Sequence, residues 1–292
     1  MSGERRGRLV LVATPIGNLA DLSPRAREVL EVADLICCED TRRTRALLSA
    51  AGVSGGDRLL SLHGHNERER LDRVAEAVAG GATVAVVSDA GTPGIADPGA
   101  WLAAQLAARG ETISTVPGPS AVLGALVVSG LPTERFCVEG FLPRKGSARR
   151  RRIAALLADE RTTVVLEAPG RVAATLAELA EVAGDGATGR PVAVVRELTK
   201  VHEEVWRGTL ADAATAFAAR EVRGEVVLVI GGAPAPAAFD ESDVEAAVRA
   251  ALDREPSAGP RQVADRVAAQ LGVPRRQAYE AALRVRAPSG GS

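Results

Sequence analysis

The sequence has few aromatic residues, few cysteines and no long apolar run, and each shortage excludes a class of protein. Aromatic residues make up 2% of the 292 residues, so a core must be built from Ala, Val, Leu and Ile. Cys37, Cys38 and Cys137 form neither a disulfide framework nor a metal-ligand spacing, so we expect no metal. No stretch approaches the roughly 18 apolar residues of a membrane span, and the polar start MSGERRGRLVLVA is unlike a signal peptide. We therefore expect a soluble cytoplasmic protein.

An excess of one charge is also missing. The chain has 36 Lys and Arg against 37 Asp and Glu, a net charge of -1, so any case for a nucleic-acid partner must come from local clustering. The 46% hydrophobic and 25% charged fractions are typical of folded globular chains. At roughly 150 residues per domain, the length predicts about two domains.

Short apolar runs typical of buried strands alternate with helical segments along the first part of the chain. They cover residues 8–13, 34–39, 58–63, 83–88 and 112–116. Because these runs are apolar almost throughout, they favour a parallel sheet with helices on both faces. Ser23 followed by Pro24 marks the start of one helix.

The pattern resumes after a turn-rich junction at residues 116–121. Further strands are expected at 136–141, 163–168, 191–197 and 225–230, and an extra extended segment at 202–210 could pair antiparallel. The sequence thus predicts an α/β protein with two domains, at 1–117 and 118–232, built on mostly parallel sheets with helices on both faces.

A Pro/Ala/Gly-rich linker at 231–240 precedes a region without strand signals, residues 240–288. Helices are expected at 240–252, at 260–271 and in a last segment that ends near residue 285. Two short helices around a Gly-containing turn are a helix-turn-helix candidate. Because residues 258–292 contain six Arg and two acids, this region could contact nucleic acid. A small helical cap that happens to be basic is an equal alternative.

Turns rich in Gly and Pro follow three of the expected strands, at 14–18, 88–99 and 117–120. In a parallel α/β sheet, ligands bind outside the carboxyl ends of the strands. The glycines let the backbone approach a ligand closely, and Asp89 offers a carboxylate to hydroxyl or amino groups. The alternative is a set of ordinary turns, with Asp97 as a helix cap. The usual Gly-rich nucleotide-binding motifs are missing.

Six cations and no acid lie within nine residues after the expected strand at 136–141. They are Arg144, Lys145, Arg149, Arg150, Arg151 and Arg152. This cluster could engage several phosphates of an RNA, and a solvated helix face is the alternative. Arg42, Arg43 and Arg45 form a second, weaker cluster.

Six sequence blocks, in their order and spacing, resemble the bacterial ribosomal RNA small subunit methyltransferase I family, a branch of the tetrapyrrole (corrin/porphyrin) methylase superfamily. The blocks are TPIGNLADLSPRA, LICCEDTRRT, LHGHNE, SDAGTPGIADPG, VPGPSA and RELTKVHEEVWRG. The resemblance covers about residues 8–232 and, less specifically, the tail. It implies a two-domain methylase fold with S-adenosylmethionine (S-adenosyl-L-methionine) between the domains. It also implies a homodimer and 2′-O-methylation of a cytidine ribose in the decoding region of 16S rRNA of the 30S ribosomal subunit.

The resemblance also implies which residues contact the cofactor: Pro15, Asp89, Gly91, Ile95, Ala96, Ser120, Ala121, Leu166 and Ala168. Methyl transfer to a ribose hydroxyl needs alignment and help in removing a proton. Lys200 and Glu197 are the main candidates for this role, and Glu39 and Asp40 are further candidates. The alternative for Lys200 is an ion pair that joins the domains.

Two other functions remain open from the sequence. One is methylation of a tetrapyrrole or another small molecule, against which the arginine cluster and the basic tail argue. The other is a non-catalytic, ribosome-associated RNA-binding protein that retains a cofactor cleft.

Overall fold

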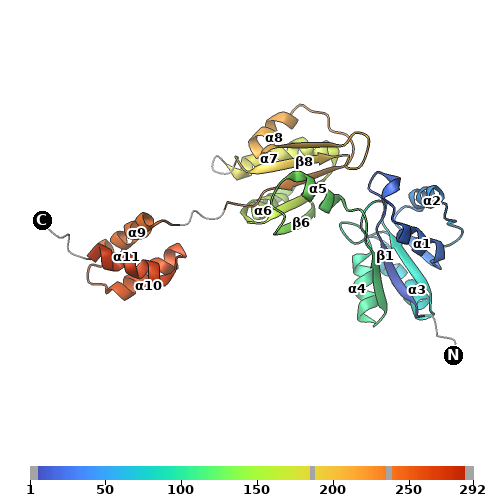
Figure 1. Ribbon diagram of the computed structural model, residues 1–292, viewed down its shortest axis with the longest axis horizontal. Helices are drawn as coiled ribbons and strands as arrows, with labels where there is room; N and C mark the ends of the chain where they lie inside the picture. Colours follow the sequence, from blue (N-terminus) through green and yellow to red (C-terminus); the bar gives the residue numbers. More distant parts are fainter. Residues whose placement is uncertain (1–5, 185–187, 235–238, 287–292) are drawn as a thin grey trace. The chain divides into compact units, whose positions relative to one another are not determined.

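A computed structural model of the chain describes residues 6–184, 188–234 and 239–286. The chain divides into two compact units, Met1–Ala233 and Pro234–Ser292. The first unit contains two sheets with their helices, and the second is helical (Figure 1). The predicted α/β architecture with a helical C-terminal region is therefore confirmed. The predicted boundary between residues 117 and 118 stays a prediction, although β5 ends at Val116 and α5 begins at Ala121.

The first sheet is parallel, as the apolar runs predicted. Its strand order is β3-β2-β4-β1-β5. The strands are β1 (Arg8–Val12), β2 (Leu35–Cys38), β3 (Leu59–Ser61), β4 (Thr83–Val87) and β5 (Thr112–Val116). All carboxyl ends of a parallel sheet lie at one edge, so the loops that follow these strands are brought together there.

Helices cover both faces of this sheet. On one face, α1 (Pro24–Val32) and α2 (Thr41–Ala50) contribute Leu30 and Leu48 to a core with Val10 and Ile36. On the other face lie α3 (Glu67–Ala79) and α4 (Ala100–Ala108). The hydroxyl of Ser23 accepts a hydrogen bond from the backbone N–H of Ala26, so the predicted start of α1 is confirmed.

The second sheet is mixed, and the expectation of a mostly parallel sheet is wrong here. Its order is β6-β7-β10-β8-β9, with β6 and β7 parallel and each of the other neighbouring pairs antiparallel. Burial on both faces explains the error, because it makes strands apolar throughout whatever their direction. The strands are β6 (Phe136–Phe141), β7 (Thr162–Glu167), β8 (Pro191–Arg196), β9 (Glu204–Thr209) and β10 (Val226–Ile230). The antiparallel option for the segment that contains β9 is confirmed.

Helix α5 (Ala121–Ser129) packs on one face of the second sheet through Val122, Ala125 and Leu126. The opposite face is covered by α6 (Gly146–Ala158), α7 (Val172–Ala183) and α8 (Leu210–Phe217). Because α5 follows β5 directly, the junction places its first turn beside the carboxyl edge of the first sheet.

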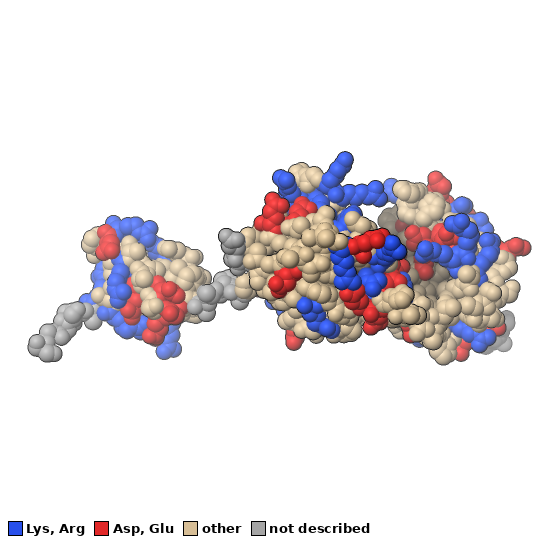
Figure 2. Space-filling model, turned by 90° about the horizontal axis from the view of Figure 1, so that it is seen from above, with Lys and Arg blue, Asp and Glu red and all other residues tan. Residues whose placement is uncertain are grey.

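The described part of the C-terminal unit consists of α9 (Glu241–Arg254), α10 (Pro260–Leu271) and α11 (Arg275–Arg286). These helices agree with the predicted ones and share their own apolar core, which includes Val244, Val263 and Ala278. On the face visible in Figure 2, their Arg side chains lie beside Asp and Glu side chains. Residues 287 and 288 of the predicted region, and residues 235–238 of the predicted linker, lie outside the described ranges. Among the described helices, none is long and apolar enough to cross a membrane.

Candidate active site

A cavity of about 370 Å³ lies in the first unit and takes its lining from both sheets. The first sheet contributes the loops after β1 and β4 and part of α2, and the second sheet contributes the ends of β6, β7 and β10. The start of α5 completes the lining. This volume is within the range of small-molecule sites, roughly 300–1,000 Å³.

The wall from the first sheet is acidic. The Oδ1 atom of Asp89 accepts a hydrogen bond from the backbone N–H of Asp40 at 3.0 Å, and Oδ2 lies 3.4 Å from Nη1 of Arg43. Burial, followed by the charges of Glu39 and Asp89, raises the pKa of Asp97 to about 6. Burial and the charge of Asp89 also raise the pKa of Glu39. Crowded carboxylates of this kind favour a cationic ligand.

The loop after β4 is held in place by its neighbours. The backbones of Thr14 and Gly91 exchange two hydrogen bonds, of 2.9 and 3.0 Å, which join the loops after β1 and β4. Gly91 has φ of +82°, and a Cβ there would lie 3.4 Å from the side chain of Ile16. Buried Glu67 accepts hydrogen bonds from the N–H groups of Gly99 and Leu102 at the start of α4. The carboxylate that caps this helix is thus Glu67, and Asp97 is left to face the cavity.

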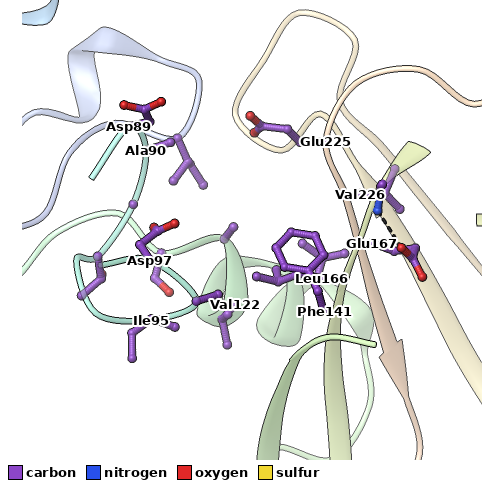
Figure 3. A pocket seen from close by; sticks show the side chains of 18 of the residues that line it. Asp89, Ala90, Ile95, Asp97, Val122, Phe141, Leu166, Glu167, Glu225 and Val226 are labelled. Carbon is purple, nitrogen blue, oxygen red and sulfur yellow. Dashed lines mark hydrogen bonds between the residues drawn. The ribbon is translucent and has the colours of Figure 1, made fainter. Parts of the chain in front are cut away.

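The wall from the second sheet is mostly apolar (Figure 3). Leu166, Val226 and Phe141 lie on this side, opposite Asp89 and Asp97. Phe141 ends β6 and is 57% exposed. The site therefore combines an acidic wall with an apolar one, an arrangement that suits a ligand with a cationic part and a flat apolar part.

Most of the residues expected to bind the cofactor lie together in this cavity. Asp89, Gly91, Ile95, Ala96, Ser120, Ala121, Leu166 and Ala168 line it. Pro15 is buried and is absent from the lining among the described residues, whereas the adjacent Ile16 is part of it. Sequence reasoning missed Phe141 and Glu225, and it treated Asp97 as a possible helix cap. The position of Asp97 inside SDAGTPGIADPG was the available signal for that residue.

Lys200 and Glu197 lie beside the cavity and are not part of its lining in the described chain. The Nζ atom of Lys200 is 2.8 Å from Glu197 Oε1 and 3.2 Å from Oε2 of Glu225, which does line the cavity. Burial lowers the pKa of Lys200, but hydrogen bonds to both carboxylates outweigh burial and raise this pKa above its usual value. Lys200 therefore stays protonated at neutral pH, which disfavours its predicted role as a base. It can position Glu225.

The ion pair of Lys200 lies within the second α/β part, so it does not itself join the domains. Contacts between this segment and the loop after β1 are made instead by Thr199 and by the aliphatic part of Lys200. The backbone N–H of Asn18 donates to Oγ1 of Thr199 at 3.2 Å, and a Cβ on Gly17 would lie 2.4 Å from the Lys200 side chain. Glu197 and Thr199 have φ of +51° and +66°, which are strained for these residues. The TPIGN and RELTK blocks thus meet at the edge of the site.

The predicted RNA-binding cluster divides into free and bound cations. Arg144, Lys145, Arg150 and Arg151 are exposed and have no hydrogen-bond or ion-pair partner among the described residues. We refer to these four residues as the α6 basic patch. Arg152 forms an ion pair with Glu139.

Arg149 must be removed from the predicted RNA-binding set. It is buried, and it donates to Glu178, to Thr175 Oγ1 at 2.9 Å and to the carbonyl of Pro143 at 3.1 Å. Its guanidinium therefore has its partners inside the fold, which disfavours a contact with RNA.

The other cationic regions are largely paired. Arg42 binds Asp40 at 2.9 Å, and Arg43 binds Asp89. In the C-terminal unit, Arg266, Arg275, Arg276 and Arg284 pair with acidic side chains, and Arg286 donates to backbone carbonyls. Within the described part of this unit, Arg261 is the arginine without such a partner. The α6 basic patch is thus the stronger candidate for phosphate contacts.

Comparison with known proteins identifies the class. Residues 8–214 match the family described as Tetrapyrrole (Corrin/Porphyrin) Methylases, and the chain belongs to this family. Within it, the sequence is 46% identical to ribosomal RNA small subunit methyltransferase I of Mycobacterium tuberculosis (strain CDC 1551 / Oshkosh), over 98% of each chain. It is 40% identical to the Synechocystis protein of the same name, over 96% of this chain and 99% of the relative.

Solved structures share the fold. The uroporphyrin-III C-methyltransferase of Thermus thermophilus, complexed with S-adenosyl homocysteine, matches 77% of this chain and 97% of its own, with a TM-score of 0.53 and 23% identity. At this identity the likeness establishes the fold alone.

Proposed function

We propose that the chain transfers a methyl group from S-adenosylmethionine to the 2′-oxygen of a cytidine ribose in 16S rRNA of the 30S subunit. The observation that carries this proposal is a two-walled cavity in the same unit as the α6 basic patch, whose cations have no partner among the described residues. The relatives named ribosomal RNA small subunit methyltransferase I support the substrate class. We also propose that the protein acts in the cytoplasm, where ribosomal RNA is found. We propose further that it forms a homodimer.

The cavity fits the chemistry of S-adenosylmethionine. The sulfonium and ammonium groups of this cofactor are cationic, and Asp89 and Asp97 supply negative charge on one wall. Leu166, Val226 and Val227 on the other wall supply an apolar surface for an adenine ring. When bound, the cofactor supplies an electrophilic methyl group. The described residues contain no cluster of three or more His, Cys, Asp or Glu suited to a metal ion.

We assign the acceptance of the proton of the ribose hydroxyl to Asp97, a carboxylate that lines the cavity while Glu67 caps α4. Its pKa of about 6 makes it a carboxylate at neutral pH and a better base than an ordinary aspartate. Lys200, which stays protonated, fixes the carboxylate of Glu225 at the rim. The acid–base role predicted for Lys200 and Glu197 is thereby replaced by a positioning role.

RNA is favoured over a tetrapyrrole by the α6 basic patch. A lysine or arginine side chain binds a phosphate more strongly when it is not already paired with an acidic side chain. A porphyrinoid substrate supplies a few carboxylates and would leave most of an extended cationic surface unused. A non-catalytic RNA-binding role is disfavoured by the membership of the chain in a methylase family.

Transfer of tritium from labelled S-adenosylmethionine tests the proposal. Purified 30S subunits, free 16S rRNA and a corrinoid precursor are offered separately, and the RNA is then digested to nucleosides. We expect label in 2′-O-methylcytidine from 30S subunits. Label in the corrinoid alone, or in a methylated base, would overturn the proposal.

A further inference from the structure

Segment 141–145 runs from the cavity to the α6 basic patch, and it contains an aromatic ring that core packing does not explain. Phe141 lines the cavity while 57% of the residue is exposed. By contrast, the rings of Trp206 and Phe217 pack against each other, with centroids 5.6 Å apart, at the core of the second sheet. In a chain with only 2% aromatic residues, Phe141 is placed on a ligand surface.

The backbone between Phe141 and the first patch cation is fixed from inside the fold. Nη2 of Arg171 donates to the carbonyl of Leu142 at 2.9 Å, and Nη1 of Arg149 donates to the carbonyl of Pro143 at 3.1 Å. The side chain of Leu142 is buried in the core. The ring of Phe141 and the cation of Arg144 therefore start from a rigid piece of backbone.

The two arginines that hold this backbone also belong to a network that reaches the cavity wall. Arg149 donates to Thr175 at 2.9 Å, and the Thr175 hydroxyl donates to Glu167 at 2.6 Å. Glu167 also binds Arg171 at 2.8 Å and accepts from the N–H of Ala168 at 2.8 Å. Because Glu167 and Ala168 line the cavity, the network fixes segment 141–145 relative to the cofactor wall.

We propose that Phe141 is a stacking platform for the base of the target nucleotide, and that Arg144 and Lys145 contact the phosphates beside it. This inference rests on the proposed function. A nucleotide must leave its helical stack before its ribose can enter a cavity, and an aromatic ring replaces the stacking it leaves behind. The acidic wall around Asp89 repels phosphates, which favours a path of the strand over the α6 side.

Substitution of Phe141 tests this assignment in the full-length protein. Phe141→Ala is expected to lower kcat/KM for 30S subunits by roughly 5- to 150-fold, the loss that corresponds to one stacked base. Phe141→Tyr keeps the ring and should stay within about threefold of the parent protein. Phe136→Ala is the matched control, because Phe136 is an exposed ring on the same strand, 37% exposed, and lies outside the cavity lining. It should leave kcat/KM unchanged.

Two further measurements, of cofactor affinity and of salt dependence, separate the possible outcomes. Calorimetry should give the same cofactor Kd for Phe141→Ala and the parent, whereas an equally weakened Kd would assign the ring to the adenine of the cofactor and overturn the proposal. The slope of log kcat/KM against log salt should be unchanged in Phe141→Ala and shallower in Arg144→Ala/Lys145→Ala. Unchanged kcat/KM in Phe141→Ala also overturns the proposal. Failure of the parent protein to methylate 30S subunits would refute the proposed function instead.

Discussion

Arg43 and Asp89 form an ion pair on the lining of the cavity, with Nη1 and Oδ2 3.4 Å apart. The pair joins the first turn of α2 to the loop after β4, so it connects two segments at the carboxyl edge of the first sheet. Because the Arg43 side chain is 66% exposed, the pair adds little to stability, about 0–1 kcal/mol. The charge of Arg43 also opposes the rise in the pKa of Glu39 that burial and Asp89 cause.

Asp89→Asn is expected to weaken cofactor binding by roughly 10- to 150-fold, the loss of one hydrogen bond to a charged group. Its carboxylate is fixed by Arg43 and by the N–H of Asp40, so no neighbour can replace it. Calorimetry with S-adenosylmethionine measures this loss. Asp72→Asn is the control, because Asp72 pairs with Arg109 on an exposed surface. Equal affinity in Asp89→Asn and the parent would contradict the assignment.

Arg150→Ala/Arg151→Ala is expected to weaken 30S binding and to make its salt dependence shallower. Removal of one cation–phosphate interaction reduces the slope by about 0.7–0.9. Cofactor affinity should be unchanged. Arg275→Ala/Arg276→Ala is the control, since those cations already bind Asp265 and Glu280. Binding titrations over a series of salt concentrations test both. If the two double variants change the slope equally, the claim that the unpaired cations contact phosphates more than the paired ones is refuted.

Arg149→Ala is expected to destabilise the fold by about 2–4 kcal/mol, because it leaves Glu178 and the carbonyl of Pro143 without their buried partner. Arg150→Ala removes an adjacent exposed cation and should change the free energy of unfolding by less than about 0.5 kcal/mol. Urea denaturation of both variants measures the difference. Arg149 would instead be a surface cation if its loss left the unfolding midpoint unchanged and weakened RNA binding.

Methylation by the parent protein is expected to rise with pH around 6, as Asp97 loses its proton. Asp97→Asn removes the base and should lower kcat at all pH values while abolishing this rise. A pH profile of kcat at saturating cofactor, recorded for both proteins, tests the role. A rise near pH 6 that persists in Asp97→Asn would assign the titration to another group.

The titration of Asp97 also affects the stability of the fold, which should fall with rising pH while activity rises. Because the folded protein raises the pKa of Asp97 from 3.8 to about 6, the native state binds the proton more tightly than the unfolded state. The free energy of unfolding therefore falls as pH rises from about 4 to above 6. Asp97→Asn avoids this loss, so its Tm should exceed that of the parent near pH 8 and approach it near pH 4.

Local patterns were sufficient to predict most of the elements, and tertiary pairing explains what they missed. The apolar run at 112–116 and the helix at 260–271 agree with β5 and α10 residue for residue. The direction of β10 could not be predicted, because strand insertion between β7 and β8 leaves no local mark. Apolar runs report burial, and both parallel and antiparallel strands can be buried.

Residues of the candidate site could be predicted where one loop supplies several of them. They were missed where a contact depends on a partner distant in the sequence. The block SDAGTPGIADPG supplies Asp89, Gly91, Ile95 and Ala96 to one wall, so one motif was enough. The burial of Arg149 depends on Glu178, which lies 29 residues away on α7. In sequence, Arg149 is indistinguishable from the exposed Arg150 and Arg151. The catalytic role of Lys200 stays a prediction, and its ion pair with Glu225, 25 residues further along the chain, could likewise not be predicted from the sequence.

Deletion of residues 234–292 is expected to leave a folded unit that binds the cofactor with the affinity of the full chain. The residues that line the cavity all lie between Ile16 and Val227. The apolar core of the C-terminal helices is drawn from residues 244–285, and the cores of the two sheets from residues before 231. Each unit thus buries its own apolar surface, so the cut should expose no new patch.

Thermal melting and cofactor titration of the truncated protein test this independence, and 30S methylation tests what the tail adds. Because most tail arginines already bind acidic side chains, we expect kcat/KM for 30S subunits to fall less than in Arg150→Ala/Arg151→Ala. A truncated protein that aggregates or loses the cofactor would show that the tail covers the first unit. A fall larger than that of the double variant would show instead that the helices bind RNA through groups other than their paired arginines.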